Sequence, residues 1–155
     1  MRADDALCHH ATVTVAAPAE RALAFMADGL KLGTWAMGCW NTRAAGPDLF
    51  VGTSLFDGSE GYVRIVVDRV LMNVDYHVGA APDRLAHMNT ARVIPGTALG
   101  LDPAHCVVSL LAWRPATMSD AHWQRIRITH EAEMLLIQSW LTRPVNIKNG
   151  SQPTA

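Results

Sequence analysis

The sequence predicts an α+β domain in which a curved, seven-stranded antiparallel sheet wraps around a long C-terminal helix. Three observations support this fold class. The chain opens with one strand pattern and two short helical patterns, continues with six strand-like runs, and closes with one long helical pattern. The connections between the runs are short, which indicates antiparallel neighbours. Strands that are segregated from helices along the chain are typical of the α+β class.

The first three elements follow from local pattern. Residues 10–16 (HATVTVA) alternate between apolar and polar side chains, which predicts a half-buried strand. Pro18 stands where a helix can begin, and Asp28–Gly29 is a stop signal for that helix. Residues 30–35 predict a second short helical turn that ends near Trp35.

Six strand-like runs follow, and Gly, Pro and Asp separate them at turn positions. The runs cover residues 37–46, 49–58, 61–69, 71–79, 84–96 and 104–115. The closing helix should begin at Ser119 or Asp120 as N-cap and end near Arg143, because Pro144 stops it.

One domain accounts for the whole chain. With 155 residues, half of them hydrophobic and 17% charged, the chain has enough apolar material for a sizeable core. We expect the domain to cover residues 10–143, with an N-terminal extension over residues 1–9 and a polar, frayed tail over residues 144–155.

Charge, cysteine content and hydropathy exclude several classes of protein. The net charge of −1 gives no basic surface for nucleic acid. The three cysteines form no CxxC pair, the N-terminus lacks a signal-peptide pattern, and no apolar run is long enough to span a membrane. A cytoplasmic location follows as an expectation.

The order of these elements resembles the SRPBCC superfamily, the helix-grip fold of START domains, plant pathogenesis-related allergens and polyketide cyclases. The resemblance rests on residues 13–35 (VTVAAPAERALAFMADGLKLGTW), on residues 91–100 (ARVIPGTALG) and on the long final helix. It covers roughly residues 10–143 and implies a hydrophobic pocket between the sheet and that helix. It supplies no universal catalytic motif. A nuclear-transport-factor-like cone and a lipocalin fit less well, since the first groups its helices at the front and the second lacks the early helix pair.

Strand alternation sorts the residues that can face such a pocket. In the run 71–79, Val74 and Tyr76 share the apolar face, which we expect to point inward. Asp75 and His77 share the opposite face. The favoured interpretation of that face is a solvated surface with cross-strand charge pairs, and the alternative is an acid–base pair.

The run 84–96 is less clear. Met88, Thr90 and Arg92 share one face, so an inward Met88 would bring Thr90 and Arg92 inward as well. An arginine in an apolar cavity needs an anionic or carbonyl partner, which a ligand can supply. The other possibility is that Arg92 pairs with a surface acid near the end of the strand.

Aromatic residues are the other candidates for pocket walls. The chain has five tryptophans and three phenylalanines, and indoles suit aromatic ligands. Trp35 and Trp113 are the preferred walls, although ordinary core packing is the commoner role for any single tryptophan. The remaining ligand-binding candidates are Trp40, Trp123 and Met134.

His130 lies in the most apolar stripe of the long helix, on one face with Trp123, Met134 and Ile137. A histidine that faces a pocket can act as general acid or base, and Glu133 lies three residues away to tune it. The alternative is a buried neutral histidine that only packs. A second apolar group, around Ile128, makes a homodimer plausible.

No motif predicts a metal ion or a cofactor. The adjacent Cys8, His9 and His10 would need further ligands to hold a metal, and His122 and His130 are too far apart for a helical zinc site.

Together with the resemblance, these residues predict a cofactor-independent enzyme of the cyclase, dehydratase or lyase type. It would act on a small hydrophobic molecule of aromatic or polyketide-like character. His130 would move a proton, and Arg92 or Tyr76 would hold a developing oxyanion. The alternative function is a non-catalytic carrier or sensor of a hydrophobic ligand, and composition does not separate the two.

Overall fold

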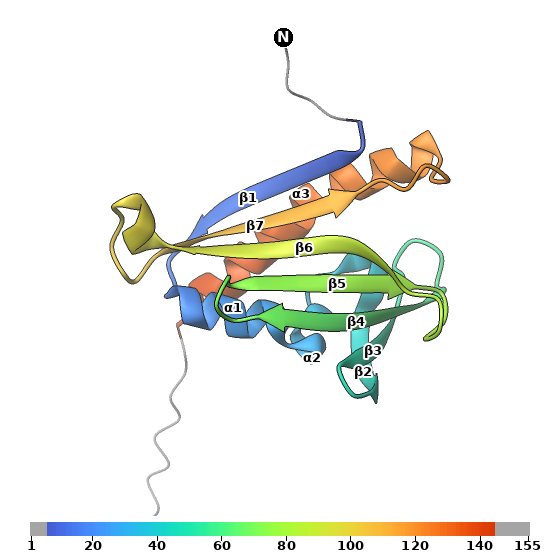
Figure 1. The fold of residues 1–155 in the computed structure, drawn as a ribbon, viewed down its shortest axis with the longest axis horizontal. Helices are drawn as coiled ribbons and strands as arrows, with labels where there is room; N and C mark the ends of the chain where they lie inside the picture. The colour runs from blue at the N-terminus through green and yellow to red at the C-terminus, as the bar shows by residue number, and fades with distance from the viewer. Residues whose placement is uncertain (1–5, 145–155) are drawn as a thin grey trace, which may run out of the picture.

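A curved antiparallel sheet holds the long helix α3 in its concave side (Figure 1). The computed structural model describes residues 6–144. The strands are β1 (Cys8–Val15), β2 (Trp40–Gly46), β3 (Leu49–Thr53), β4 (Glu60–Asp68), β5 (Asn73–Gly79), β6 (Ala86–Pro95) and β7 (Cys106–Trp113). The helices are α1 (Ala19–Ala27), α2 (Gly29–Leu32) and α3 (Asp120–Thr142), with short 3₁₀ turns η1 (Met37–Cys39) and η2 (Gly96–Leu99).

The seven strands form one sheet in the order β1-β7-β6-β5-β4-β3-β2, and all pairs are antiparallel. Strands β2 to β7 follow one another as hairpin neighbours because their connections are short. Strand β1 pairs with the last strand, β7, in the register Val15 to Cys106 and Cys8 to Trp113. The predicted helix-grip architecture is therefore confirmed.

Two side-chain caps fix where helices begin. The Ser119 side chain accepts a hydrogen bond from the His122 N–H at 3.2 Å and starts α3, as the sequence predicts. The Asp28 side chain accepts from the Leu30 and Lys31 N–H groups and starts α2 directly after α1. One aspartate therefore ends the first helix and begins the second.

The core lies between the sheet, α1 and the C-terminal half of α3. The side chains of Met26 on α1 and of Met134, Ile137 and Leu141 on α3 are almost completely buried. Helix α1 contacts β4, β5, β6, β7 and α3, so the short helices close one end of the concave side, as expected.

Some boundaries differ from the sequence interpretation. Strand β1 begins at Cys8, two residues before the expected start, and residues 37–39 form a 3₁₀ turn instead of part of a strand. The predicted tail over residues 145–155 and the first five residues of the predicted extension lie outside the described residues. Within residues 6–144, every helix is too short or too polar to cross a bilayer.

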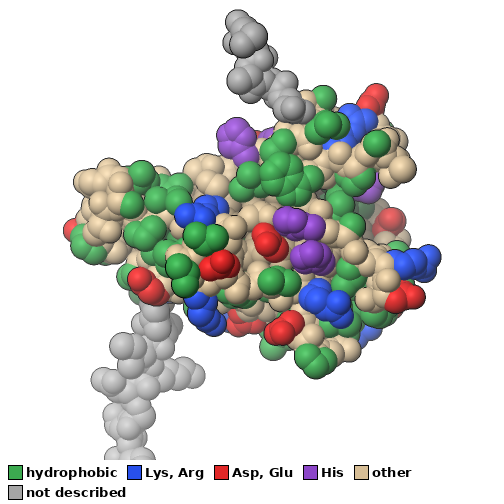
Figure 2. All heavy atoms as spheres, in the orientation of Figure 1, with side chains coloured by type: hydrophobic (Ala, Val, Ile, Leu, Met, Phe, Trp, Pro, Cys, Tyr) green, Lys and Arg blue, Asp and Glu red, His purple; other side chains and the backbone are tan. Residues whose placement is uncertain are grey.

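The outer face of the sheet carries a polar cluster, and Figure 2 shows its neighbouring histidines at the surface. The His77 and His87 rings stack with centroids 5.1 Å apart. His87 Nε2 lies 3.3 Å from Asp75 Oδ1, and the Thr90 hydroxyl donates to the same carboxylate oxygen at 2.7 Å. Asp75 and His77 therefore lie on the outer face of β5, as the favoured interpretation had it.

Candidate functional site

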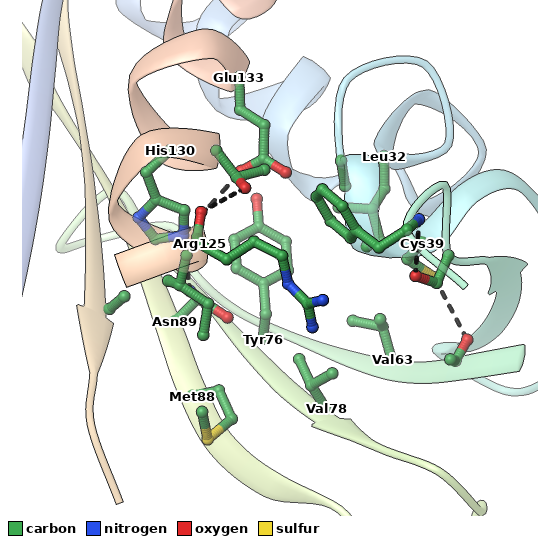
Figure 3. Close-up of a pocket in the computed structure, with 18 of the residues that line it drawn as sticks. Leu32, Cys39, Val63, Tyr76, Val78, Met88, Asn89, Arg125, His130 and Glu133 are labelled. Carbon is green, nitrogen blue, oxygen red and sulfur yellow. Dashed lines mark hydrogen bonds and ion pairs between the residues drawn. The ribbon is translucent and has the colours of Figure 1, made fainter. Parts of the chain in front are cut away.

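A pocket of about 440 Å³ lies between the sheet and the N-terminal half of α3 (Figure 3). Trp35 and the η1 turn form one wall, the inward residues of the sheet form the floor, and α3 forms the roof. Val63, Tyr76 and Leu110 are buried apolar residues of the floor. The pocket is therefore largely apolar, and its polar groups come from α3, from Asn89 and from the turn between β3 and β4.

One face of α3 supplies these polar groups at helical spacing. Its members, which all line the pocket, are His122, Arg125, Ile126, Thr129, His130 and Glu133. Residues three or four apart share a face of a helix, so these side chains project in one direction. The C-terminal half of α3 carries mainly apolar residues on the corresponding face and packs into the core.

His130 is a neutral base in this setting. Its side chain is 5% exposed, and burial, aided by the nearby charge of His9, lowers its pKa to about 4. His130 Nε2 lies 3.1 Å from Asn89 Nδ2. An amide nitrogen only donates, so Nε2 is the acceptor and the ring hydrogen of the neutral imidazole sits on Nδ1. Nδ1 has no hydrogen-bond partner among residues 6–144.

Glu133 is a neutral acid beside it. The side chain is 6% exposed, and burial raises its pKa to about 8, although the Met37 N–H donates to Oε1 at 2.8 Å and opposes that shift. Glu133 therefore keeps its proton at neutral pH. Its Oε2 lies 4.0 Å from His130 Nε2, which is too far for a hydrogen bond. A protonated carboxyl and a free-base imidazole thus lie side by side without an ion pair.

Tyr76 is a wall residue whose hydroxyl hydrogen is already engaged. The hydroxyl donates to the Met26 carbonyl at 2.7 Å, and the side chain is 2% exposed. Burial, together with the charges of Glu133 and Asp75, raises the pKa of Tyr76 far above its ordinary value. Its ring meets Trp35 edge-on, with centroids 6.0 Å apart. This geometry gives Tyr76 a structural role and leaves it no hydrogen to offer an oxyanion.

Cys39 also lines the pocket, but its thiol is inert. The thiol donates to the Gly61 carbonyl at 3.2 Å, and burial raises its pKa to about 11. A cysteine nucleophile needs the thiolate, which this environment disfavours.

Four of the residues that the sequence nominated line the pocket: Trp35, Tyr76, Met88 and His130. Trp123 and Met134 are 5% and 2% exposed, but they pack within the protein and do not line the pocket. The apolar stripe of α3 therefore marks mainly the core contact of the helix, and of its residues Ile126 and His130 also line the pocket.

The prediction that Arg92 and Thr90 point inward with Met88 is wrong, and a β-bulge explains why. In the register of β5 with β6, Tyr76 faces Asn89 and His77 faces His87, so Met88 is an extra residue. Both Met88 and Asn89 then reach the pocket, and alternation resumes with Thr90 outside.

The register with β7 places Arg92 on the outer face in the same way. Arg92 is paired with Ser109, whose hydroxyl meets that of Thr12 across β1 in an exposed contact. The inward residues on either side of Arg92 are Ala91 and Val93, both fully buried. The guanidinium of Arg92 therefore does not reach the cavity, and no ligand contact follows for it.

Trp113 and Trp40 do not line the pocket either. Strand β7 points Val108, Leu110 and Ala112 inward, so Trp113 projects outward and is 39% exposed. Both faces of this strand are apolar in sequence, so alternation does not decide between them, and the preference for Trp113 as a pocket wall is wrong. Trp40 is the first residue of β2 and is half-buried outside the cavity.

Sequence reasoning missed Asn89 and Arg125 and gave Glu133 only a tuning role. Regular alternation puts Asn89 on the face opposite Met88, and only the bulge brings both residues to the pocket. Arg125 and Glu133 stand at the i−5 and i+3 positions of His130, on the pocket face of α3. Helical spacing from His130 would have selected Glu133, whereas Arg125 lies about 140° around the helix from His130, at the edge of the pocket face.

Cys8, His9 and His10 lie on β1, and the ring of His9 lies 5.8 Å from that of His130. Among residues 6–144, no three side chains of His, Cys, Asp or Glu gather as metal ligands do.

No family model matches the chain, and no curated protein matches its sequence significantly. Solved structures do match. A START superfamily protein from Mycobacterium smegmatis gives a TM-score of 0.64 at 12% identity and covers 87% of this chain and 97% of that one. The Zhui aromatase/cyclase from Streptomyces sp. R1128 gives 0.63 at 16% identity, with 92% and 98% covered. A protein from Bacillus thuringiensis gives 0.66 at 14% identity, with 88% and 99% covered.

These identities are low, so the likeness concerns the fold and not the reaction. The element order, the sheet order and the position of α3 agree with the sequence-based expectation. The chain therefore has the SRPBCC-like helix-grip fold that START proteins and aromatase/cyclases share.

Proposed function

We propose that this protein is a cofactor-independent enzyme that moves protons on a small aromatic or polyketide-like carbonyl compound. The reaction class is cyclisation, dehydration or lyase chemistry, which share an enol or enolate intermediate. The observation that carries the proposal is the pair formed by His130 Nε2 and Glu133 Oε2, 4.0 Å apart on the pocket face of α3.

The pair has the protonation states that such chemistry needs. Neutral His130 holds a lone pair on Nε2, and neutral Glu133 holds a proton on the carboxyl whose Oε1 is already occupied by the Met37 N–H. A neutral base and a neutral acid near neutral pH arise here mainly from burial.

One step illustrates the chemistry. His130 Nε2 removes a proton from the carbon next to a carbonyl group, and Glu133 gives its proton to the carbonyl oxygen. The products are the enol, an imidazolium and a carboxylate, so charge and protons balance. The new ion pair stabilises itself at this distance. The Asn89 amide, which donates to Nε2 in the free protein, must yield that lone pair to the substrate.

The size and lining of the pocket support the choice of substrate class. A volume of about 440 Å³ is within the usual range for small-molecule sites, and the walls include Trp35 and Tyr76. Flat apolar walls favour an aromatic or pre-aromatic ligand. The Zhui structure is described as an aromatase/cyclase, which is consistent with the proposal but belongs to that protein.

Hydrogen–deuterium exchange of α-tetralone tests the proposal without knowledge of the natural substrate. This two-ring ketone exchanges its α-hydrogens through the enol, and NMR in D₂O follows the loss of signal. We expect the protein to accelerate exchange at pH 7 with saturation in ketone concentration. The variant His130→Gln should lose the acceleration by about 10²–10⁴-fold while it still binds the ketone.

Arg127→Met is the matched control, because Arg127 is an exposed residue of the same helix outside the pocket lining. If His130→Gln accelerates the exchange to within a few-fold of the wild type, His130 is only a packing residue. Tight binding of α-tetralone with no accelerated exchange in the wild type would instead support a carrier or sensor.

A further inference from the structure

Arg125 is the one Arg or Lys residue among the described residues that line the pocket. Figure 3 shows its side chain extending from α3 toward the centre of the pocket, between Tyr76 and Val63. The Arg125 backbone carbonyl accepts a hydrogen bond from the Thr129 hydroxyl at 2.6 Å, one helical turn before His130. Arg125 therefore borders the same pocket as the proposed proton-transfer pair, at the edge of the pocket face of α3.

The acidic residues near the pocket mouth form no ion pair with Arg125 within 4.0 Å, although hydrogen bonds from Ser59 and, to a smaller extent, the charge of Arg125 lower the pKa of Asp57. Glu60 pairs with Arg43 at 2.6 Å. The Asp57 carboxylate accepts hydrogen bonds from the Ser59 hydroxyl at 2.7 Å and from the Ser59 N–H at 3.0 Å. Within residues 6–144, no carboxylate lies within 4.0 Å of the Arg125 guanidinium and no acceptor meets its N–H groups.

Phe56 holds this guanidinium without using its hydrogen-bond donors. The carbon at the centre of the guanidinium lies 4.8 Å from the centroid of the Phe56 ring. A cation over an aromatic face is attracted by the ring, but the N–H groups at the edge of the guanidinium stay available. Two parallel N–H groups are the arrangement that binds a carboxylate in bidentate fashion.

We infer that Arg125 recognises an anionic group of the ligand, so the substrate is an acid with an apolar ring body. The inference rests on the proposed function for the position of the reacting carbonyl group. The carboxylate binds Arg125, and the ring body lies in the cavity against the wall that Tyr76 and Trp35 form together. The carbonyl group then reaches His130 and Glu133.

The helix sets the spacing of these two ends. Arg125 and His130 are five residues apart, which is about 7.5 Å along the helix axis. A ring system with a carboxylate at one end and a ketone at the other therefore suits the site better than a compact acid. A neutral ligand fills the same pocket, but the guanidinium of Arg125 then has only water as a hydrogen-bond partner.

The test compares two ketones that differ by one charge. The probes are α-tetralone and a derivative that carries a carboxylate on its aromatic ring. The carboxylate is para to the aromatic carbon that bears the CH₂ chain of the ketone ring. Binding is measured by isothermal titration calorimetry at pH 7. We expect the carboxylate to bind about 10-fold tighter than the neutral ketone, and the advantage to shrink as salt is added.

Arg125→Met should reduce the ratio of the two dissociation constants to about one, because Met keeps the aliphatic length without the charge. Arg125→Lys should retain part of the advantage, since it keeps the charge but not the bidentate geometry. Arg127→Met controls for the loss of one positive charge from α3 and should leave the ratio unchanged.

The outcomes separate this inference from the proposed function. Equal affinity of the wild type for both ketones, or an equal loss for both in Arg125→Met, overturns the anion site even if α-tetralone exchange is accelerated. An Arg125-dependent preference for the carboxylate without any exchange supports the anion site and overturns the enzyme. If neither ketone binds at millimolar concentration, both are overturned.

Discussion

The buried carboxyl of Glu133 should make the stability of the protein fall as pH rises, and Glu133→Gln should remove that dependence. The pKa of Glu133 is about 8 in the folded protein, against 4.5 as its ordinary value. Between these values the folded state holds a proton that the unfolded state has released. The stabilisation is complete below pH 4.5 and is lost as pH rises through 8.

The magnitude follows from the width of that window. Each pH unit between the two pKa values costs about 1.4 kcal/mol, so the full loss is up to about 5 kcal/mol. His130 acts in the opposite direction. Its pKa is about 4 when folded and 6.5 ordinarily, so its contribution to stability is present above 6.5 and is lost as pH falls toward 4.

The two residues oppose each other below pH 6.5, and Glu133 acts alone above it. The free energy of unfolding should therefore change little from about pH 4.5 to 6.5 and fall by about 2 kcal/mol from 6.5 to 8. In Glu133→Gln, the amide still accepts from the Met37 N–H but cannot ionise. The fall above pH 6.5 should disappear.

The assay is urea unfolding of both proteins, followed by tryptophan fluorescence at half-unit pH steps from 5 to 8. The difference between the two unfolding free energies isolates Glu133, since the other groups are common to both. Asp83→Asn, in an exposed turn, controls for the loss of one surface carboxylate. If the unfolding free energies of the wild type and of Glu133→Gln change in the same way between pH 5 and 8, a buried, protonated Glu133 is refuted.

Two other predictions concern residues around the pair. Asn89→Asp places a carboxylate beside His130 Nε2, so NMR titration of the ring should show its pKa rising by about 1–3 units from about 4. An unchanged value would mean that Asn89 does not face Nε2. Arg92→Met, on the outer face of β6, should alter the affinity for either ketone by less than two-fold in calorimetry. A ten-fold loss would return Arg92 to the pocket.

The fold was predictable because each element has a strong local signal. Alternation over residues 10–16 and the Ser119 cap before a long apolar period describe β1 and α3 without reference to the rest of the chain. The position of α3 in the concave side came from the family resemblance. Strand boundaries were less accurate, because the 3₁₀ turn at residues 37–39 has no distinct composition.

The site was only partly predictable because it depends on register. Alternation placed Tyr76 correctly in a regular strand, but it failed on β6, where the bulge at Met88 shifts every later residue. Nothing in the run of residues 84–96 marks that bulge with a Gly or Pro at its site. The face of β7 was ambiguous because both faces are apolar, and Trp113 was chosen for its size.

The pocket lies where the composition of α3 changes and where two strands of the sheet present small residues. At the end covered by α1, the inward residues are branched: Ile65, Val74, Val93 and Val108, all buried. At the other end β4 and β7 present Gly61 and Ala112, which also line the cavity. A methyl group added at Gly61 would approach the Gly38 carbonyl at 3.2 Å, so this strand has no room to fill the space from below. Apolar residues of α3 complete the filled end, and over the open end the same helix carries His130 and Glu133. The change of composition along α3 therefore places the helix's ionisable residues over the space that a ligand can occupy.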